Sequence, residues 1–147
     1  MNDHINRQSS EILKSVYRNA DMAYESSGDV LKHCVHTRLR HEISAERERY
    51  RSVASQARSE LVRRGCVPKP YPPHIKAMSK MGIEMKTMSD SGSQKLAELM
   101  IRGTTMGIID MQHALNSSAK AEERIIRDAD GLLKREQQFV DRLKKYL

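Results

Sequence analysis

The sequence predicts an all-α fold, and three observations lead to that class. Apolar residues recur every three or four positions over long stretches, as they do along the buried face of a helix. Only seven Gly and four Pro interrupt the 147 residues, too few for the many turns of an all-β protein. With no Trp and one Phe, the core must be filled by aliphatic side chains and by nine Met. We expect one helical-bundle domain over residues 1–147.

The N-terminal half predicts two helices, over about 4–25 and 29–64. The segment Ser26-Ser27-Gly28 predicts the end of the first helix, and Asp29 is a suitable N-cap for the second. The second helix has no internal Gly or Pro, ends before Gly65 and would be the longest element. The short link predicts an antiparallel hairpin. The apolar faces of the two helices include Ile12, Val16, Ala20, Leu39, Ile43, Ala57 and Leu61.

The rest of the chain predicts three more helices, over about 73–89, 93–115 and 119–146. Prolines between 68 and 73 exclude a helix there, but Pro73 can open a short helix lined by Met. The pair Ser91 and Gln94 fits a capping box before the fourth helix. Glu122 and Glu123 suit the first turn of the last helix, where the helix dipole favours negative charge.

Two hairpins joined by a long crossover form the ferritin-like variant of the four-helix bundle. The stretches LMIRGTTMGIID (99–110) and FVDRLKKYL (139–147) resemble an uncharacterised family of small bacterial ferritin-like bundle proteins. The resemblance covers most of the chain in the order of its elements, and it implies this fold. The family has no established catalytic residues, so the resemblance transfers no site. The Arg-rich segment 38–51 is where the chain departs from that family.

Inward carboxylates are the main candidates for a site. Standard di-iron centres take Glu-x-x-His from each of two helices, and no Glu here is followed by His three positions later. Glu46, Asp110 and Glu136 nevertheless fall on predicted apolar faces, and His113 follows Asp110 at helical spacing. A buried carboxylate must be paired, protonated or metal-bound. The favoured interpretation is that they pair with an arginine (Arg38 or Arg49), bind hydroxyls of Thr104 or Tyr, or lie at a water-exposed edge of the apolar face. An unusual divalent metal site is the alternative.

Two further motifs have both a structural and a functional interpretation. His33 and His36, with Cys34 between them and His41 beyond, could chelate a divalent ion if they share a helix face, although solvated surface histidines are commoner. The small-residue pair Gly103 and Gly107 predicts close contact with a facing helix, and the alternative is a surface that accepts a second subunit or a ligand. No phosphate-binding loop or nucleophile motif is present, so we assign no catalytic or cofactor-binding residues.

Charge and cysteine content limit the possible binding partners and the cellular compartment of the protein. The net charge is +7, but Glu42, Glu46 and Glu48 interrupt the basic face of the second helix, which disfavours nucleic acid. Cys34 and Cys66 lie near opposite ends of that helix, beyond disulfide reach, which suits a reducing cytoplasm. No uncharged run is long enough to span a membrane, and the N-terminus lacks the apolar stretch of a signal peptide.

Together, these features favour a noncatalytic structural or interaction bundle in the cytoplasm. We expect a homo-oligomer, with a protein partner as a further option. One alternative is a metal-binding or redox-related ferritin-like protein. The third hypothesis is a nucleic-acid or polyanion binder.

Overall fold

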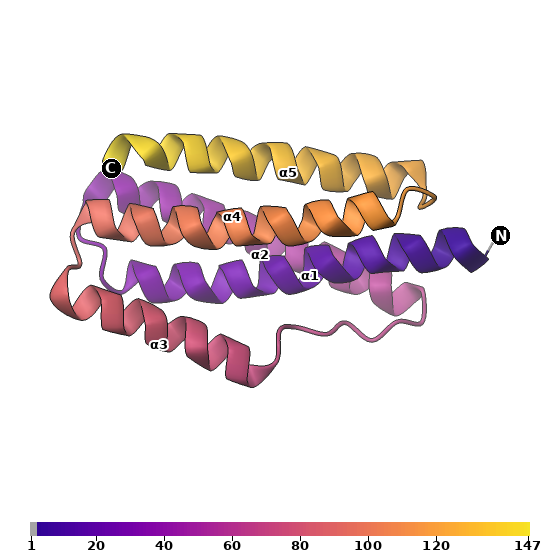
Figure 1. Cartoon of the computed structure of the whole chain (residues 1–147), viewed down its shortest axis with the longest axis horizontal. Coiled ribbons are helices and arrows are strands. Elements are labelled where there is room, and N and C mark those ends of the chain that lie inside the picture. Colours follow the sequence, from indigo (N-terminus) through magenta and orange to yellow (C-terminus); the bar gives the residue numbers. More distant parts are fainter. Residues whose placement is uncertain (1–2) are drawn as a thin grey trace.

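A computed structural model describes residues 3–147 and is helical throughout, with no strand in that range (Figure 1). The all-α class predicted from the sequence is therefore confirmed. None of the helices in residues 3–147 combines the length and apolar character needed to cross a membrane. The elements are α1 (Asp3–Leu31), α2 (Thr37–Arg63), α3 (Pro73–Ser89), α4 (Ser93–Ser117), α5 (Glu123–Leu143) and the short 3-10 helix η1 (Lys144–Tyr146).

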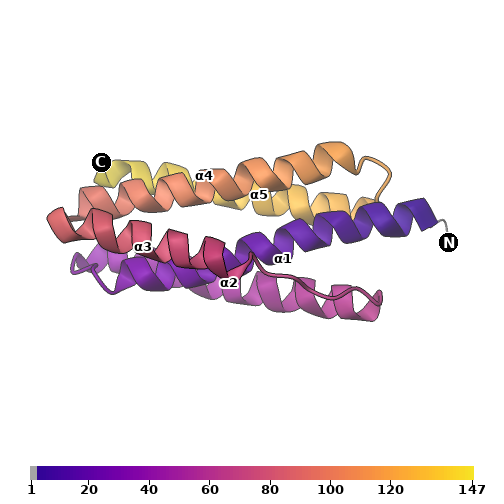
Figure 2. The ribbon, with the colours of Figure 1, turned by 60° about the horizontal axis from the view of Figure 1, so that its bottom comes forward.

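The four long helices form two antiparallel hairpins. Helices α1 and α2 make the first and α4 and α5 the second, while α1 also packs along α4 (Figure 1). The chain crosses from the end of α2 to the start of α4 through an extended segment and α3. Helix α3 lies outside the four long helices, beside α1 (Figure 2).

The boundary between the first two helices differs from the prediction. Helix α1 continues through the expected stop to Leu31, so α2 begins at Thr37 and has 27 residues. Asp29 is therefore not the N-cap of α2. His36 is that cap, and its Nδ1 accepts a hydrogen bond from Leu39 N at 3.2 Å.

Burial explains why α1 does not stop at its Ser-Ser-Gly-Asp segment. Ser27 and Val30 are fully enclosed, so unwinding there would expose core surface. The Ser27 hydroxyl donates within the helix, to Tyr24 O at 3.1 Å. Helix α1, with 29 residues, is thus the longest element, rather than the second helix as expected.

The other boundaries agree more closely. Helix α3 has the predicted bounds, and Gly65 follows α2 with a φ of 74°, which suits a glycine after a helix. The predicted capping box is wrong, because Gly92 is the N-cap of α4 and no side chain caps the helix. The last helix begins at Glu123, later than the predicted residue 119.

The core consists of two hydrophobic clusters. One contains Ile12, Leu61, Met111 and Ile125, and the other contains Val30, Ile43, Met100 and Phe139. Between the two clusters, α2, α4 and α5 contribute buried polar side chains, which are Glu46, Tyr50, Thr104 and Glu136. We refer to these four residues as the polar layer.

Candidate functional site

The polar layer is the most unusual feature of the bundle interior. Glu46 and Tyr50 lie one turn apart on α2, and Glu136 projects from α5. Glu46 is 3% exposed and Glu136 is 5% exposed, so both carboxyl groups are almost completely shielded from solvent. The structure thus brings together two of the three inward acids that the sequence predicted.

Glu46 is an ion-paired carboxylate. Its Oε2 accepts a hydrogen bond from Arg49 Nη1 at 3.0 Å, and Arg142 Nη2 lies 3.6 Å from the same oxygen. Pairing of an inward acid with Arg49 was one of the alternatives predicted from the sequence, and it is confirmed for Glu46. Burial raises the pKa of Glu46, against the opposing effect of the two arginines.

Glu136 lacks such a partner. Burial, and then repulsion from the Glu46 charge, raise the pKa of Glu136 from 4.5 to about 8, although its contact with Tyr50 acts in the opposite direction. At neutral pH Glu136 is therefore a neutral carboxylic acid beside an ionised one. The pair retains a proton that two exposed glutamates would have lost.

Two oxygen atoms in this layer have unused hydrogen-bonding capacity. Glu136 Oε2 and Tyr50 Oη are buried, and neither has a hydrogen bond of good geometry in the described chain. Glu136 and Thr104 lie close enough to Tyr50 to influence its pKa, which burial raises well above 10.0. A buried oxygen without a partner is costly, so this layer could accept a proton donor or a cation.

The polar layer offers oxygen ligands only. Two carboxyl groups, a phenol and a hydroxyl are hard oxygen donors of the kind that suit Mg²⁺, Ca²⁺ or Mn²⁺ once Glu136 has lost its proton. Arg49 and Arg142, however, already neutralise Glu46. Within residues 3–147, no group of three or more His, Cys, Asp and Glu side chains is arranged to hold a metal ion.

Asp110, the third inward acid, binds residues of α1 instead. Its carboxylate accepts hydrogen bonds from Ser15 at 2.9 Å, from Arg18 at 2.8 to 3.1 Å and from Asn19. Burial would raise the pKa of Asp110, but these bonds outweigh burial and lower it. Asp110 is a bridge between α4 and α1. These donors to Asp110 were not identified from the sequence. The available signal was that Ser15 and Asn19 are polar residues one turn apart near the apolar face of α1.

The histidine candidates do not form a ligand cluster. His113 is exposed on α4. His33 lies in the turn after α1 rather than on α2, and its Nε2 is 3.4 Å from Glu84 Oε1. His36 caps α2 and its ring packs edge-on against Tyr146. The spacing argument for His33 and His36 fails because the two residues do not share a helix.

Gly103 and Gly107 differ in their surroundings. A side chain added at Gly107 would contact Asn19 of α1 at 3.6 Å, as expected for a close helix contact. One added at Gly103 would meet nothing within 4 Å. The predicted small-residue contact therefore holds at Gly107 and is wrong at Gly103.

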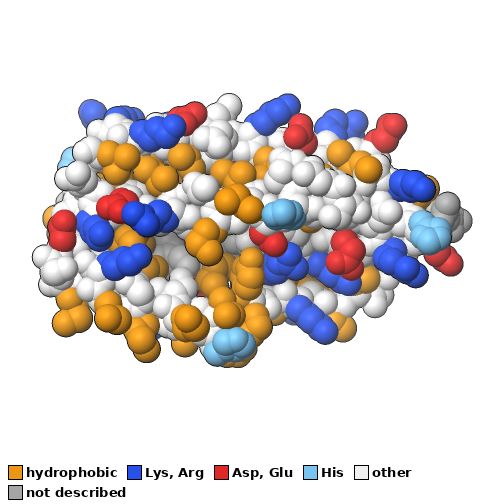
Figure 3. All heavy atoms as spheres, in the orientation of Figure 1, with side chains coloured by type: hydrophobic (Ala, Val, Ile, Leu, Met, Phe, Trp, Pro, Cys, Tyr) orange, Lys and Arg blue, Asp and Glu red, His pale blue; other side chains and the backbone are white. Residues whose placement is uncertain are grey.

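An exposed methionine stripe runs along α3. Met78, Met81, Met85 and Met88 are 61 to 85% exposed and recur at spacings of three and four, so they share one helix face. The buried residues of α3, Ile83 and Thr87, lie on the opposite face, towards the bundle. Figure 3 shows hydrophobic side chains along the lower edge of the molecule, where α3 lies.

The protonated state of Glu136 predicts how stability changes with pH. The folded chain keeps a proton on Glu136 that the unfolded chain releases above its ordinary pKa of 4.5. The free energy of unfolding should therefore fall as pH rises from about 4.5 to about 8. We expect Glu136→Gln, which mimics the neutral acid, to flatten this dependence and to gain about 1–3 kcal/mol near pH 8.

Urea denaturation across this pH range measures the effect. Glu48→Gln is the matched control, because Glu48 is an exposed residue of α2, and it should leave the pH profile unchanged. A Glu136→Gln variant that follows the wild-type profile would show that Glu136 is ionised in the folded protein.

The Asp110 bridge predicts a second stability effect. Asp110→Asn removes the charge that Arg18 binds, and we expect a loss of about 1–3 kcal/mol at neutral pH. Because the folded pKa of Asp110 is lowered, its contribution is present above the ordinary value of 3.8 and disappears as pH falls below it. The difference between variant and wild type should therefore shrink in acid, as measured by thermal or urea unfolding.

Asp130→Asn is the control for the Asp110 measurement, because the ion pair of Asp130 with Lys134 is solvent-exposed. It should change stability by less than about 0.5 kcal/mol. Equal losses in Asp110→Asn and Asp130→Asn would contradict a special role for the bridge.

Comparisons with known proteins give no match of any of three kinds. No protein-family model, no curated protein and no solved structure matches the chain. The resemblance of 99–110 and 139–147 to a bacterial ferritin-like family therefore stays a prediction. Function has to be inferred from the polar layer, the methionine stripe and the other surfaces of the bundle.

Proposed function

We propose that the protein is a noncatalytic interaction bundle that self-associates through the methionine stripe of α3. The observation that carries this proposal is the exposure of four Met side chains along one helix face. Contiguous apolar surface of this kind is uncommon on a monomer and is typical of an interface. Met is also well suited to such a surface because its unbranched side chain adapts to a partner.

A second copy of the chain is the occupant that the stripe fits best. A two-fold contact brings the same surface of both subunits together, so an apolar stripe meets an identical one. The stripe itself contains no charge, whereas Lys80 and Lys86 lie off its line on α3. Two antiparallel α3 helices can therefore pair Met with Met while these lysines remain in solvent.

The ferritin-like assignment belongs to this proposal. Its support is the arrangement of two antiparallel hairpins joined by a crossover, with α1 packed on both α2 and α4. The two unpaired cysteines, Cys34 and Cys66, support a cytoplasmic location. A noncatalytic role is favoured because the most perturbed ionisable groups, in the polar layer, are enclosed within the bundle.

A second candidate function is binding of a divalent cation in the polar layer. The unpartnered Glu136 Oε2 and Tyr50 Oη favour it, since a cation would satisfy both oxygens. Glu136 would have to release its proton, so binding should strengthen as pH rises towards about 8. Asp110 is not part of this ligand set, because Arg18 and its neighbours bind it.

Light scattering after size exclusion tests self-association. We expect wild-type protein to form dimers. The triple variant Met81→Gln, Met85→Gln, Met88→Gln should be monomeric with an unchanged circular dichroism spectrum, because these side chains do not support the core. Met106→Gln is the control, since Met106 is an exposed Met on α4. A wild-type protein that remains monomeric at its highest soluble concentration would refute the proposal.

Thermal unfolding with added Mn²⁺, Mg²⁺ or Ca²⁺ tests the second candidate. If the layer binds a cation, the midpoint should rise more at pH 8.5 than at pH 6, and Glu46→Gln should abolish the rise. Glu48→Gln should keep it. A rise that survives in Glu46→Gln would place the cation elsewhere, and no rise at either pH would remove this function.

A further inference from the structure

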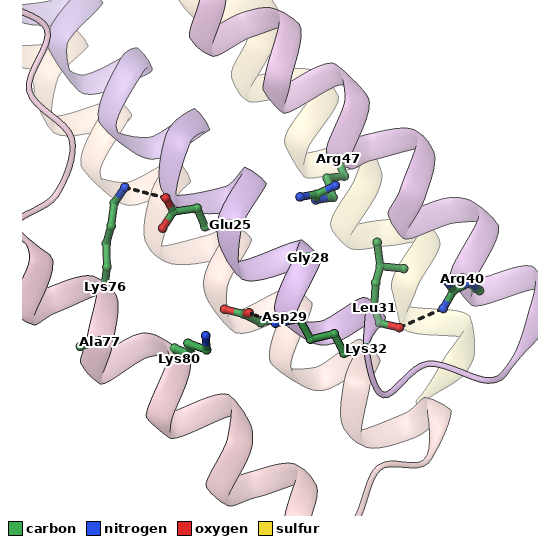
Figure 4. Close-up of a pocket in the computed structure, with 10 residues that line it drawn as sticks. All are labelled: Glu25, Gly28, Asp29, Leu31, Lys32, Arg40, Arg47, Lys76, Ala77 and Lys80. Carbon is green, nitrogen blue, oxygen red and sulfur yellow. Dashed lines mark hydrogen bonds and ion pairs between the residues drawn. The ribbon is translucent and has the colours of Figure 1, made fainter.

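We propose that a cleft between α1, α2 and α3 binds the phosphate groups of a small phosphorylated molecule. The cleft has a volume of about 580 Å³, which is ample for a small ligand. Helix α1 forms its floor, with α2 and α3 on either side (Figure 4). Basic residues dominate the lining, which includes Lys32, Arg40, Arg47, Lys76 and Lys80 against the acids Glu25 and Asp29.

Two of these cations are neutralised within the protein. Lys76 Nζ lies 2.6 Å from Asp21 Oδ2 and 2.9 Å from Glu25 Oε1. Lys32 Nζ lies 3.2 Å from Asp29 Oδ1. The acidic residues of the lining are therefore engaged by these two lysines.

The other three cations have no acidic partner in the described part of the chain. Arg40 Nη1 donates only to main-chain oxygens, Leu31 O at 2.9 Å and Cys34 O at 3.1 Å. Arg47 Nε likewise donates to Tyr24 O at 3.0 Å. Lys80 forms no hydrogen bond or ion pair with residues 3–147. Three positive charges in the cleft thus lack a carboxylate, and an anion would supply the compensating charge.

Arg47 is held in place before any ligand arrives. Its guanidinium lies over the Tyr24 ring, 3.9 Å from the ring centre, and against Gly28. A Cβ at position 28 would come within 3.0 Å of Arg47 Nη2, so glycine allows this close approach. Neither Nη atom of Arg47 donates a hydrogen bond within residues 3–147. A fixed guanidinium with unused donors is suited to bidentate binding of phosphate.

The positions of the cations favour a ligand with two phosphates. Arg40 and Arg47 come from α2 on one side of the α1 floor, whereas Lys80 comes from α3 on the other side (Figure 4). A ligand with two phosphate groups presents two sets of acceptor oxygens, one for each side of the cleft, whereas a single phosphate presents one. No methionine of the stripe lines the cleft, so the pairing of two stripes uses different side chains from those that would bind phosphate.

Isothermal titration of the full-length protein with pyrophosphate at low ionic strength tests this site. We expect one saturable site per chain with a Kd below about 1 mM, and weaker binding of inorganic phosphate and sulfate. Arg47→Gln should weaken binding about tenfold, because it removes charge-assisted hydrogen bonds. Lys80→Gln should also weaken it, and folding should be unaffected because Lys80 makes no internal contact that a fold would lose.

Two further variants separate the site from general basicity. Gly28→Ala keeps every charge but forces the Arg47 guanidinium to shift by a few tenths of an ångström, so pyrophosphate binding should weaken. Lys86→Gln removes a charge from α3 outside the cleft and should bind like wild type. The proposal is overturned if pyrophosphate gives no saturable heat or if Lys86→Gln weakens binding as much as Lys80→Gln. It is also overturned if single-stranded DNA, titrated in the same way, binds and pyrophosphate does not.

Discussion

The burial of two carboxyls in the middle of the bundle is the constraint on which the rest of the interior depends. Glu46 and Glu136 lie between two apolar clusters, so α2 and α5 must hold them at one level. Arg49 of α2 and Arg142 of α5 both lie against Glu46, so this group of charges links α5 to α2. Glu136 is buried as the neutral acid, because its raised pKa keeps it protonated at neutral pH. Replacing a buried ion pair by apolar residues is often neutral or stabilising, so this layer is not in itself evidence of a stabilised core.

Helix α1 organises the remaining helices through polar contacts as well as apolar ones. Asp110 ties α4 to it, and Ser9 Oγ accepts a hydrogen bond from Glu122 N at the start of α5, which has no side-chain cap of its own. Helix α3 packs Ile83 into the cluster around Val30, and it also contacts α1 through Lys76 and the Ser26–Ser79 contact. This peripheral attachment leaves one face of α3 uncovered and one cleft open.

The proposed interactions involve three separate regions of the molecule. The methionine stripe is apolar and faces outward, the polar layer is enclosed, and the basic cleft lies between α1, α2 and α3. They use different residues, and our proposals assign a second chain to the first, a divalent cation to the second and a phosphate to the third. Because no methionine of the stripe lines the cleft, the proposed self-association and the proposed anion binding use separate side chains.

Sequence periodicity determined the helical class, the five helices and the inward position of Glu46 and Glu136, since these depend on residues a few positions apart. The pairing of Glu46 with Arg49 is local for the same reason. Contacts between distant segments decided the rest. Because Val30 is buried, α1 continues beyond the predicted stop. Asp110 binds Arg18 of α1 rather than lying beside Glu46. Arg47 of α2 binds the main chain of Tyr24 on α1. Such contacts are set by how the helices pack in space, which no local pattern encodes.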